Sequence, residues 1–367
     1  MHISQRSSNS SNQSLYKPQK STFLGLLLLL LPLFSSCDSI STQKLASQHA
    51  SQYSILPQGK HSTISEEFMQ IKLLGSIKIK NIEINSLEVA ELSDLAWDED
   101  EQLLYAISDE GLLYHLQVSL KHGHLENIKV IFATTLKNQD KKALRGKYSD
   151  SEGLSIINAN NGIKGDSKLI ISFENKPRIA YYTPNGAFIK KVAIPKTLRK
   201  KKYYRSKNKA LESVTYHPEY GILTASEYPL KKHPKNYQSI YSSNGKSWHF
   251  PASQAKNSAI TGLETLPNGD ILVLERAYQN PIIPIIINLR RVQLNHCNKK
   301  QECDTQPIAS FNGADGWLLD NFEGLTHFKD NKYLMVSDDN GNPLQKTILT
   351  LFEIKSAKQN VLTKLKQ

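Results

Sequence analysis

SEGLSI (Ser151–Ile156), followed by ISFEN (Ile171–Asn175), is one copy of a pattern that recurs five times along this chain. In each copy an acidic residue lies beside a short apolar segment, and a second acidic residue closes the next segment. The five pairs are Asp94 and Asp109, Glu152 and Glu174, Glu212 and Glu227, Glu264 and Glu275, and Glu323 and Asp338. The period of roughly 57 residues is typical of a β-propeller blade or a long solenoid repeat.

The composition between the acidic residues favours the propeller. The first copy contains LAW, LLYAIS, LLYHLQV and VIFATTL, which are short, rich in β-branched and aromatic residues, and separated by turn-forming residues. No long segment after residue 60 has the periodicity of an amphipathic helix. We therefore predict an all-β chain, a β-propeller with five four-stranded antiparallel blades. A sixth blade is compatible with the irregular stretch between Glu275 and Glu323.

The fifth copy supplies only three strands before the chain ends. The segment MQIKLLGSIKIKNIEI, which begins at Met69, can provide the missing outer strand. We expect this N-terminal strand to close the last blade, which removes an exposed sheet edge.

The N-terminal region predicts export. The apolar run Phe23–Phe34 has 12 residues, too few to span a membrane, and it follows a basic, Ser-rich segment, as in a signal peptide. Cys37, in LFSSC, looks like the lipid-modified cysteine of a bacterial lipoprotein, with ordinary secretory cleavage as the alternative. Asp38 resembles an inner-membrane retention signal. We expect a membrane-anchored protein of the bacterial cell envelope that faces the periplasm, or one that is otherwise secreted.

These features divide the chain into a lipoprotein-type signal peptide (1–36), a flexible tether (37–67), a propeller domain (68–358) and a C-terminal tail (359–367). Cys297 and Cys303 are expected to form a disulfide across a small loop, because exported proteins meet an oxidising environment. The sequence does not indicate an oligomeric state.

The formal net charge is +12, and basic residues are concentrated between Lys196 and Lys209, in KTLRKKKYYRSKNK. This segment is either a solvated loop or a surface that attracts an anionic substrate or anionic lipid headgroups. We expect no nucleic-acid partner, since the aromatic residues do not interleave with a basic strand face.

The direction of the strands predicts where the acidic residues lie. The innermost strand of a blade and the next one run antiparallel, so the two acidic residues of each copy should meet at the same end of the blade. Repeated around the ring, this brings the carboxylates to one mouth of the central channel. Calcium prefers several oxygen ligands, which predicts a calcium site there. Hydrogen bonds that hold one blade to the next are the alternative role for these acidic residues.

Two arginines follow second acidic residues: Arg178 after Glu174, and Arg276 after Glu275. Each can form an ion pair at a blade edge, or present a two-pronged donor to an anionic ligand.

Several motifs carry a family resemblance. DNFEGL (Asp320–Leu325), SDDN (Ser337–Asn340), Gln345 and Thr347 resemble the C-terminal signature of the phytase-like domain family, also called the esterase-like activity of phytase family. DSEGL (Asp150–Leu154), FEN with PRI, NKALESVT with ASEYPL, and LPNGDILVLERAY agree with it in order, over residues 85–355. The resemblance implies a propeller that hydrolyses ester bonds, with phosphate esters as candidates. Ser213 departs from the pattern, because a glycine commonly follows the acidic residue there.

We therefore predict a calcium-assisted hydrolase of a small anionic or ester substrate. The predicted metal ligands are Glu323, Asp338 and Asp339, followed by Glu152, Glu174 and Glu212. The predicted catalytic residues are Glu275, as general base, with Arg178 and Arg276, which would also hold the anionic group. Two other functions stay open: a non-enzymatic, lipid-anchored binding propeller, and a calcium-dependent propeller of the lactonase type.

Overall fold

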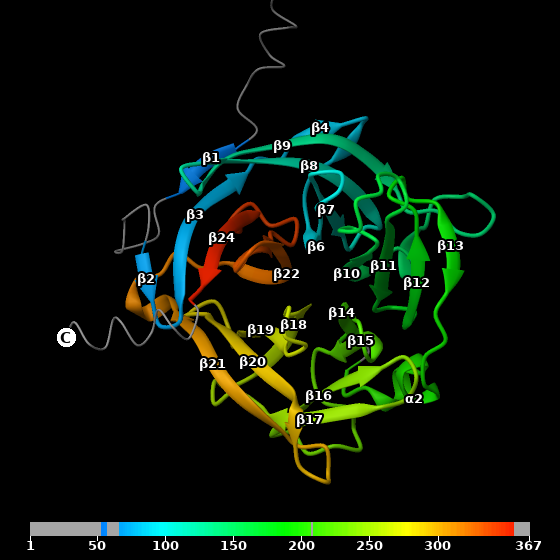
Figure 1. The fold of residues 1–367 in the computed structure, drawn as a ribbon, viewed down its shortest axis with the longest axis vertical. Helices are drawn as coiled ribbons and strands as arrows, with labels where there is room; N and C mark the ends of the chain where they lie inside the picture. The colour runs from blue at the N-terminus through cyan, green and yellow to red at the C-terminus, as the bar shows by residue number, and fades with distance from the viewer. Residues whose placement is uncertain (1–52, 57–65, 207, 356–367) are drawn as a thin grey trace, which may run out of the picture. The chain divides into compact units, whose positions relative to one another are not determined.

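The computed structural model describes residues 53–56, 66–206 and 208–355, all of which belong to the compact unit Ser51–Gln367. Five antiparallel sheets are arranged around a common axis, as the ribbon shows (Figure 1). The all-β propeller with five four-stranded blades is thereby confirmed. The stretch between Glu275 and Glu323 forms the long outer strands of blade four rather than a sixth blade.

The blades follow chain order, and each begins at its innermost strand. Blade one contains β6 (Leu92–Asp98), β7 (Leu103–Ser108), β8 (Leu112–Lys121) and β9 (His124–Thr135). Blade two contains β10 (Ser151–Ile157), β11 (Lys168–Phe173), β12 (Arg178–Tyr182) and β13 (Phe188–Lys191). Blade three contains β14 (Leu211–His217), β15 (Gly221–Ser226), β16 (Tyr237–Ser242) and β17 (Ser247–Pro251). Blade four contains β18 (Ser258–Thr265), β19 (Ile271–Ala277), β20 (Ile286–Cys297) and β21 (Cys303–Asn312). Blade five contains β22 (Asn321–Lys329), β23 (Lys332–Asp338), β24 (Ile348–Ile354) and the N-terminal β3 (Ile71–Ile79).

The ring closes as predicted, because β3 pairs antiparallel with β24, with Ile77 opposite Leu349. The outer edge of β3 is covered in turn by β1 (Tyr53–Leu56) and β2 (Glu66–Phe68). Part of the segment expected to be a flexible tether is therefore strand, since the free edge of β3 offers backbone hydrogen bonds to the chain that precedes it.

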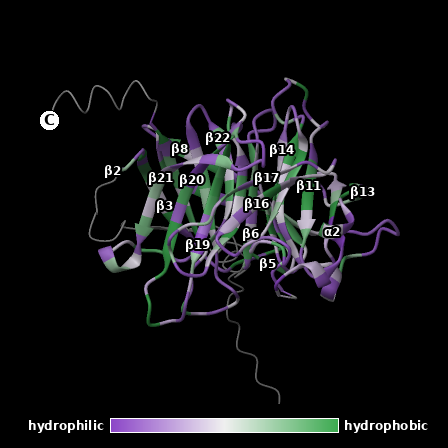
Figure 2. Cartoon of the chain, turned by 90° about the horizontal axis from the view of Figure 1, so that it is seen from below, coloured by the Kyte–Doolittle hydropathy of each residue, from purple (hydrophilic) through white to green (hydrophobic). Residues whose placement is uncertain are grey.

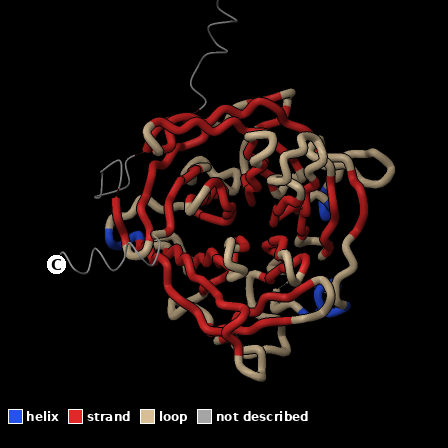
Figure 3. The backbone as a smooth tube through the Cα atoms, viewed as in Figure 1, coloured by secondary structure: helices blue, strands red, loops and turns tan. Residues whose placement is uncertain are grey.

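Little of the described chain lies outside the blades. β4 (Glu83–Ile84) and β5 (Leu87–Glu88) form a small hairpin. A short helix, α2 (Lys196–Arg199), and 3-10 turns at Gly146–Tyr148, Lys201–Tyr203 and Gly313–Asp315 complete the described elements, and Figure 3 shows how small the helical share is. Among these elements, none is a helix of the length and apolar character needed to cross a bilayer.

The hydrophobic core is divided into five clusters, one at each interface between neighbouring blades. Leu95 and Leu104 of blade one, for example, pack in one cluster with Leu334 and Leu349 of blade five. The loops at both ends of the blades are mainly hydrophilic (Figure 2). A chain of this length thus builds several small cores that share strands, rather than one large core.

Candidate functional site

A β-bulge is present in the innermost strand of every blade, and it determines which side chains reach the channel mouth. The register shifts between Leu92 and Asp94 in β6, and the shift recurs at the same place in β10, β14, β18 and β22. A bulge places an extra residue opposite the partner strand and re-aims its side chain. The five residues at this bulge position are Ser93, Glu152, Glu212, Thr261 and Glu323.

A second set of side chains comes from the end of the neighbouring strand. The residue before the bulge pairs with Ser108, Phe173, Ser226, Glu275 or Ser337 in the respective blade. The next residue along the chain is therefore at the mouth in each blade, and these are Asp109, Glu174, Glu227, Arg276 and Asp338. Together the two positions form what we call the mouth ring: seven carboxylates, two hydroxyl side chains and one arginine.

The mouth ring corrects the alignment of the repeat in two blades. In blade one the bulge residue is Ser93, and Asp94 takes the place held by Gly153 and Gly324 in blades two and five. In blade four the bulge residue is Thr261, and Glu264 lies three positions later. Glu264 lines a cavity of about 660 Å³ with Thr215, Thr326 and His327, residues near the far ends of the inner strands. It therefore does not belong to the mouth ring.

Asp94 has the structural role that was the alternative for the first acidic residues. Its Oδ1 accepts hydrogen bonds from the N–H groups of Leu95 (2.8 Å) and Leu325 (2.9 Å), and its Oδ2 accepts one from Leu154 (2.7 Å). These donors belong to blades one, five and two. One buried carboxylate thus joins three inner strands.

The carboxylates of blades two and three form two overlapping groups. Asp150, Glu152 and Glu174 each offer an oxygen within 4.8 Å of the others, and so do Glu174, Glu212 and Glu227. Glu174 is common to both groups, and its Oε1 also accepts a hydrogen bond from the N–H of Ala210 at 2.7 Å. Such clustered carboxylate oxygens are the donor set that a hard cation prefers.

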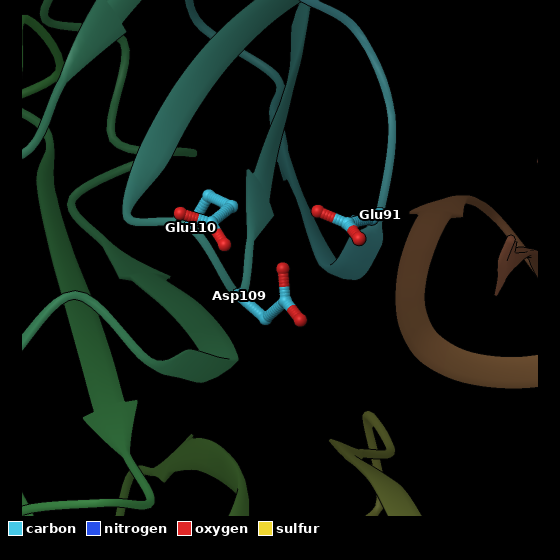
Figure 4. Close-up of side chains that lie close together, drawn as sticks. All are labelled: Glu91, Asp109 and Glu110. Carbon is cyan, nitrogen blue, oxygen red and sulfur yellow. The ribbon is translucent and has the colours of Figure 1, made fainter. Parts of the chain in front are cut away.

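A third group lies in blade one, where Glu91, Asp109 and Glu110 also have oxygens within 4.8 Å of one another. Figure 4 shows the three side chains around one space, with Glu91 before β6 and the other two in the turn after β7. Within the described residues, Asp109 Oδ1 has no hydrogen-bond partner although it is buried.

Crowding raises the pKa of the ring carboxyls. Burial, followed by the charges of Glu91 and Glu110, raises the pKa of Asp109 to about 7. Burial raises the pKa of Glu174 to about 7, against the hydrogen bond from Ala210. Burial and the neighbouring Glu323 raise the pKa of Asp338 to about 8. The pKa values of Glu152 and Glu212 are also raised, by burial first and by neighbouring carboxylates second.

Cations neutralise only part of the mouth ring. Arg276 donates to Glu323 and Asn321, and its Nη2 lies 3.4 Å from Oε1 of Glu227. Lys209 Nζ donates to both oxygens of Glu227, at 2.6 and 2.7 Å. In the described part of the chain, Glu152 and Glu212 have no hydrogen-bond or ion-pair partner. The uncompensated charge is therefore on blades two and three.

The basic segment Lys196–Lys209 reaches this mouth. Lys209 bonds Glu227, and Lys201 Nζ donates to Asn175 Oδ1 at 2.7 Å, one residue after Glu174. The segment is thus in part a set of ring partners rather than only a solvated loop.

Two predicted catalytic residues do not face the ring. Glu275 is fully buried and bonds Arg290 at 2.7 and 3.0 Å, because side chains alternate along β19 and its neighbour Arg276 takes the mouth position. Arg178 lies over the ring of Phe173, with its guanidinium 3.5 Å from the ring centroid, and donates to the carbonyls of Tyr148 and Lys176. A general base and a ligand clamp at these two residues do not fit the geometry.

The predicted metal ligands separate into two sets. Glu152, Glu174 and Glu212 lie in the clustered groups. Glu323 is engaged by Arg276, and Asp339 accepts hydrogen bonds from the N–H of Glu91 (3.1 Å) and the hydroxyl of Thr347 (3.0 Å). Asp338 lies at the mouth and accepts a hydrogen bond from the N–H of Asn340 at 2.7 Å. Glu227 and Asp150 were not predicted as ligands, although the repeat and the DSEGL motif contained them.

Comparison with protein families places this site in a known context. The model described as Phytase-like, esterase-like activity of phytase, matches residues 87–341. The chain belongs to this family. The match contains the whole mouth ring, and the family description suggests a hydrolase-type propeller.

Other comparisons add little to this assignment. No curated protein matches the sequence. The chain is similar to the PQQ-bound form of aldose sugar dehydrogenase from Streptomyces coelicolor, with 11% identity and a TM-score of 0.39 over 76% of this chain and 98% of that chain. It is also similar to the Pan2 WD40 domain of Neurospora crassa, with 10% identity and a TM-score of 0.35 over 79% of this chain and 97% of that chain. At these scores neither likeness carries an argument about function.

The role of Asp94 can be tested by removing its carboxylate. Asp94→Ala leaves three buried N–H groups without acceptors, so the free energy of unfolding should fall by about 3–5 kcal/mol. Urea unfolding measures it, with Glu83→Ala on the exposed hairpin as a control expected to change stability by less than about 0.5 kcal/mol. Equal stability of the two variants would show that Asp94 does not join the blades.

The raised pKa values predict how stability changes with pH in metal-free protein. Asp109, Glu174 and Asp338 keep protons in the folded chain that they lose in the unfolded chain, so the unfolding free energy should fall as the pH rises from about 5 to about 8. Thermal unfolding in the presence of a chelator measures this, and Glu174→Gln should make the dependence shallower. Stability that rises over this range would contradict the assignment.

Proposed function

We propose that this propeller hydrolyses esters, phosphoric monoesters in particular, with a calcium ion held at the mouth ring by Glu152, Glu174 and Glu212. The observation that carries the proposal is the pair of carboxylate groups that share Glu174, each with oxygens within 4.8 Å. Membership of a family described by esterase-like activity supports the reaction class.

The donor set fits calcium. The unpaired carboxylates of Glu152 and Glu212 offer charge that no described cation compensates, and calcium tolerates several oxygen ligands in flexible geometry. When bound, calcium supplies Lewis-acid polarisation of an ester oxygen.

The chain's own residues would provide the rest of the chemistry. Asp109 has a pKa of about 7, because burial and the charges of Glu91 and Glu110 raise it, and its Oδ1 has no partner among the described residues. A carboxylate with these properties can accept a proton from water at neutral pH, and it takes the general-base role that Glu275 cannot fill. Arg276 fixes Glu323 and Glu227, which leaves Glu152, Glu174 and Glu212 for the cation.

A cleft beside Arg276 can receive the organic part of the substrate. It has a volume of about 700 Å³, and its lining includes Asn280, Asn321, Asn340 and Gln345. Side-chain amides can both donate and accept hydrogen bonds, which suits a hydroxyl-rich, uncharged group.

Calcium binding and turnover test this proposal. Glu174→Gln should weaken calcium binding by about tenfold or more, because it removes the ligand common to both groups. Titration calorimetry measures the affinity, and hydrolysis of p-nitrophenyl phosphate, p-nitrophenyl acetate and a lactone is followed with and without calcium.

Glu264→Gln is the matched control, since it removes a carboxylate from the opposite end of the inner strands. It should leave calcium affinity within about twofold of the wild-type value. Equal losses in both variants would contradict the metal site. Calcium binding without turnover of any ester would favour the non-enzymatic binding propeller, and turnover of the lactone alone would favour the lactonase type.

We propose further that the chain is a lipoprotein of the bacterial cell envelope, anchored through Cys37 and facing the periplasm. The support is the short apolar run Phe23–Phe34 followed by Cys37, residues that lie outside the described part of the structure. Cys37→Ser should move the protein from the membrane fraction to the soluble fraction, whereas Cys303→Ser, which breaks the Cys297–Cys303 disulfide, should not. Unchanged membrane association of Cys37→Ser would overturn the anchor.

A further inference from the structure

A cation-lined cleft lies next to the mouth ring, between blades three and four. It has a volume of about 790 Å³, and its lining includes Arg205, Lys209, Lys235 and Lys256. None of the lining residues is an aspartate or a glutamate. The cleft therefore has the opposite charge to the ring beside it.

Most of this positive charge is available to a ligand. In the described chain, no carboxylate lies within ion-pair distance of Arg205, Lys235 or Lys256. Arg205 donates one hydrogen bond, from Nη2 to the carbonyl of His233 at 2.5 Å, while its buried Nε has no partner within the described residues. Lys235 and Lys256 are exposed and can reorient toward an anion.

A buried hydroxyl adds a neutral donor to the cleft. Ser258 is 8% exposed, and its Oγ has no hydrogen-bond partner in the described structure. Buried polar atoms in native proteins are nearly always hydrogen-bonded. A ligand oxygen would satisfy both Ser258 Oγ and Arg205 Nε.

The cleft is continuous with the mouth ring through shared residues. Lys209 lines the cleft and bonds Glu227 of the ring. Tyr228, another lining residue, directly follows Glu227, and Ser258 precedes the bulge residue Thr261 on β18. A molecule bound in the cleft is therefore next to the ring.

We propose that this cleft binds a phosphate group through Arg205, Lys235, Lys256 and Ser258. Arginine and lysine donors with a neutral hydroxyl, and no carboxylate, match a tetrahedral oxyanion with several acceptor oxygens. As a corollary that rests on the proposed function, the substrate hydrolysed at the ring carries a second phosphate group, which the cleft holds.

Phosphate binding is tested without calcium, so that the result does not depend on the ring. Inorganic phosphate is titrated into the full chain at pH 7 and low salt in the presence of a chelator. The paired variant Lys235→Gln/Lys256→Gln should bind phosphate about tenfold more weakly, since it removes two charge-assisted donors. Lys299→Gln/Lys300→Gln, with the same change of net charge on an exposed loop, should bind as the wild type does.

The outcomes separate this proposal from the proposed function. Absence of phosphate binding by the wild-type chain, or equal losses in the two paired variants, overturns the cleft site. Binding only to vesicles that contain phosphatidic acid, without binding of inorganic phosphate, overturns it in favour of a lipid-headgroup surface. Phosphate binding that is retained by Glu174→Gln supports the cleft site even where calcium binding or turnover fails.

Discussion

Like-charge repulsion among the carboxylates at one mouth of the propeller is the constraint to which the rest of the site responds. Seven acidic side chains from four blades converge there, and burial prevents water from screening them fully. Blade four relieves part of the repulsion, since Arg276 occupies the position that an acidic residue holds in the other blades. Lys209 relieves another part. What is left on Glu152, Glu174 and Glu212 is a negative site that a cation can occupy.

The backbone creates this convergence. The bulge at the same place in all five inner strands turns one side chain of each blade toward the mouth, and strand pairing brings the second residue beside it. Close approach of the inner strands requires glycine after the bulge residue: a Cβ at Gly324 would lie 2.7 Å from the Cα of Asp94. Asp94 then joins blades five, one and two through three backbone N–H groups. Fold and site thus depend on the same short segment of each blade.

The sequence predicted the architecture well because strand patterning and the closure of blade five by β3 are local or periodic signals. It predicted the site less well, since the repeat was aligned on acidic residues. Alignment on the glycine and leucine that follow the bulge would have excluded Glu264 and moved Asp94 to the glycine position. The choice between Glu275 and Arg276 depends on which neighbour along β19 faces the mouth, and this depends on pairing register. The contacts of Lys209 and Arg178 depend on tertiary packing, which no motif encodes.

Proton release on calcium binding tests the central claim most directly. If calcium replaces protons on the crowded ring carboxyls, titration calorimetry at pH 7 in two buffers of different ionisation enthalpy should show a net release of protons. The release should shrink as the pH is raised above about 8, where these carboxyls are already ionised. Calcium binding with no proton release at pH 7, or no calcium binding at all, would contradict a cation site at the mouth ring.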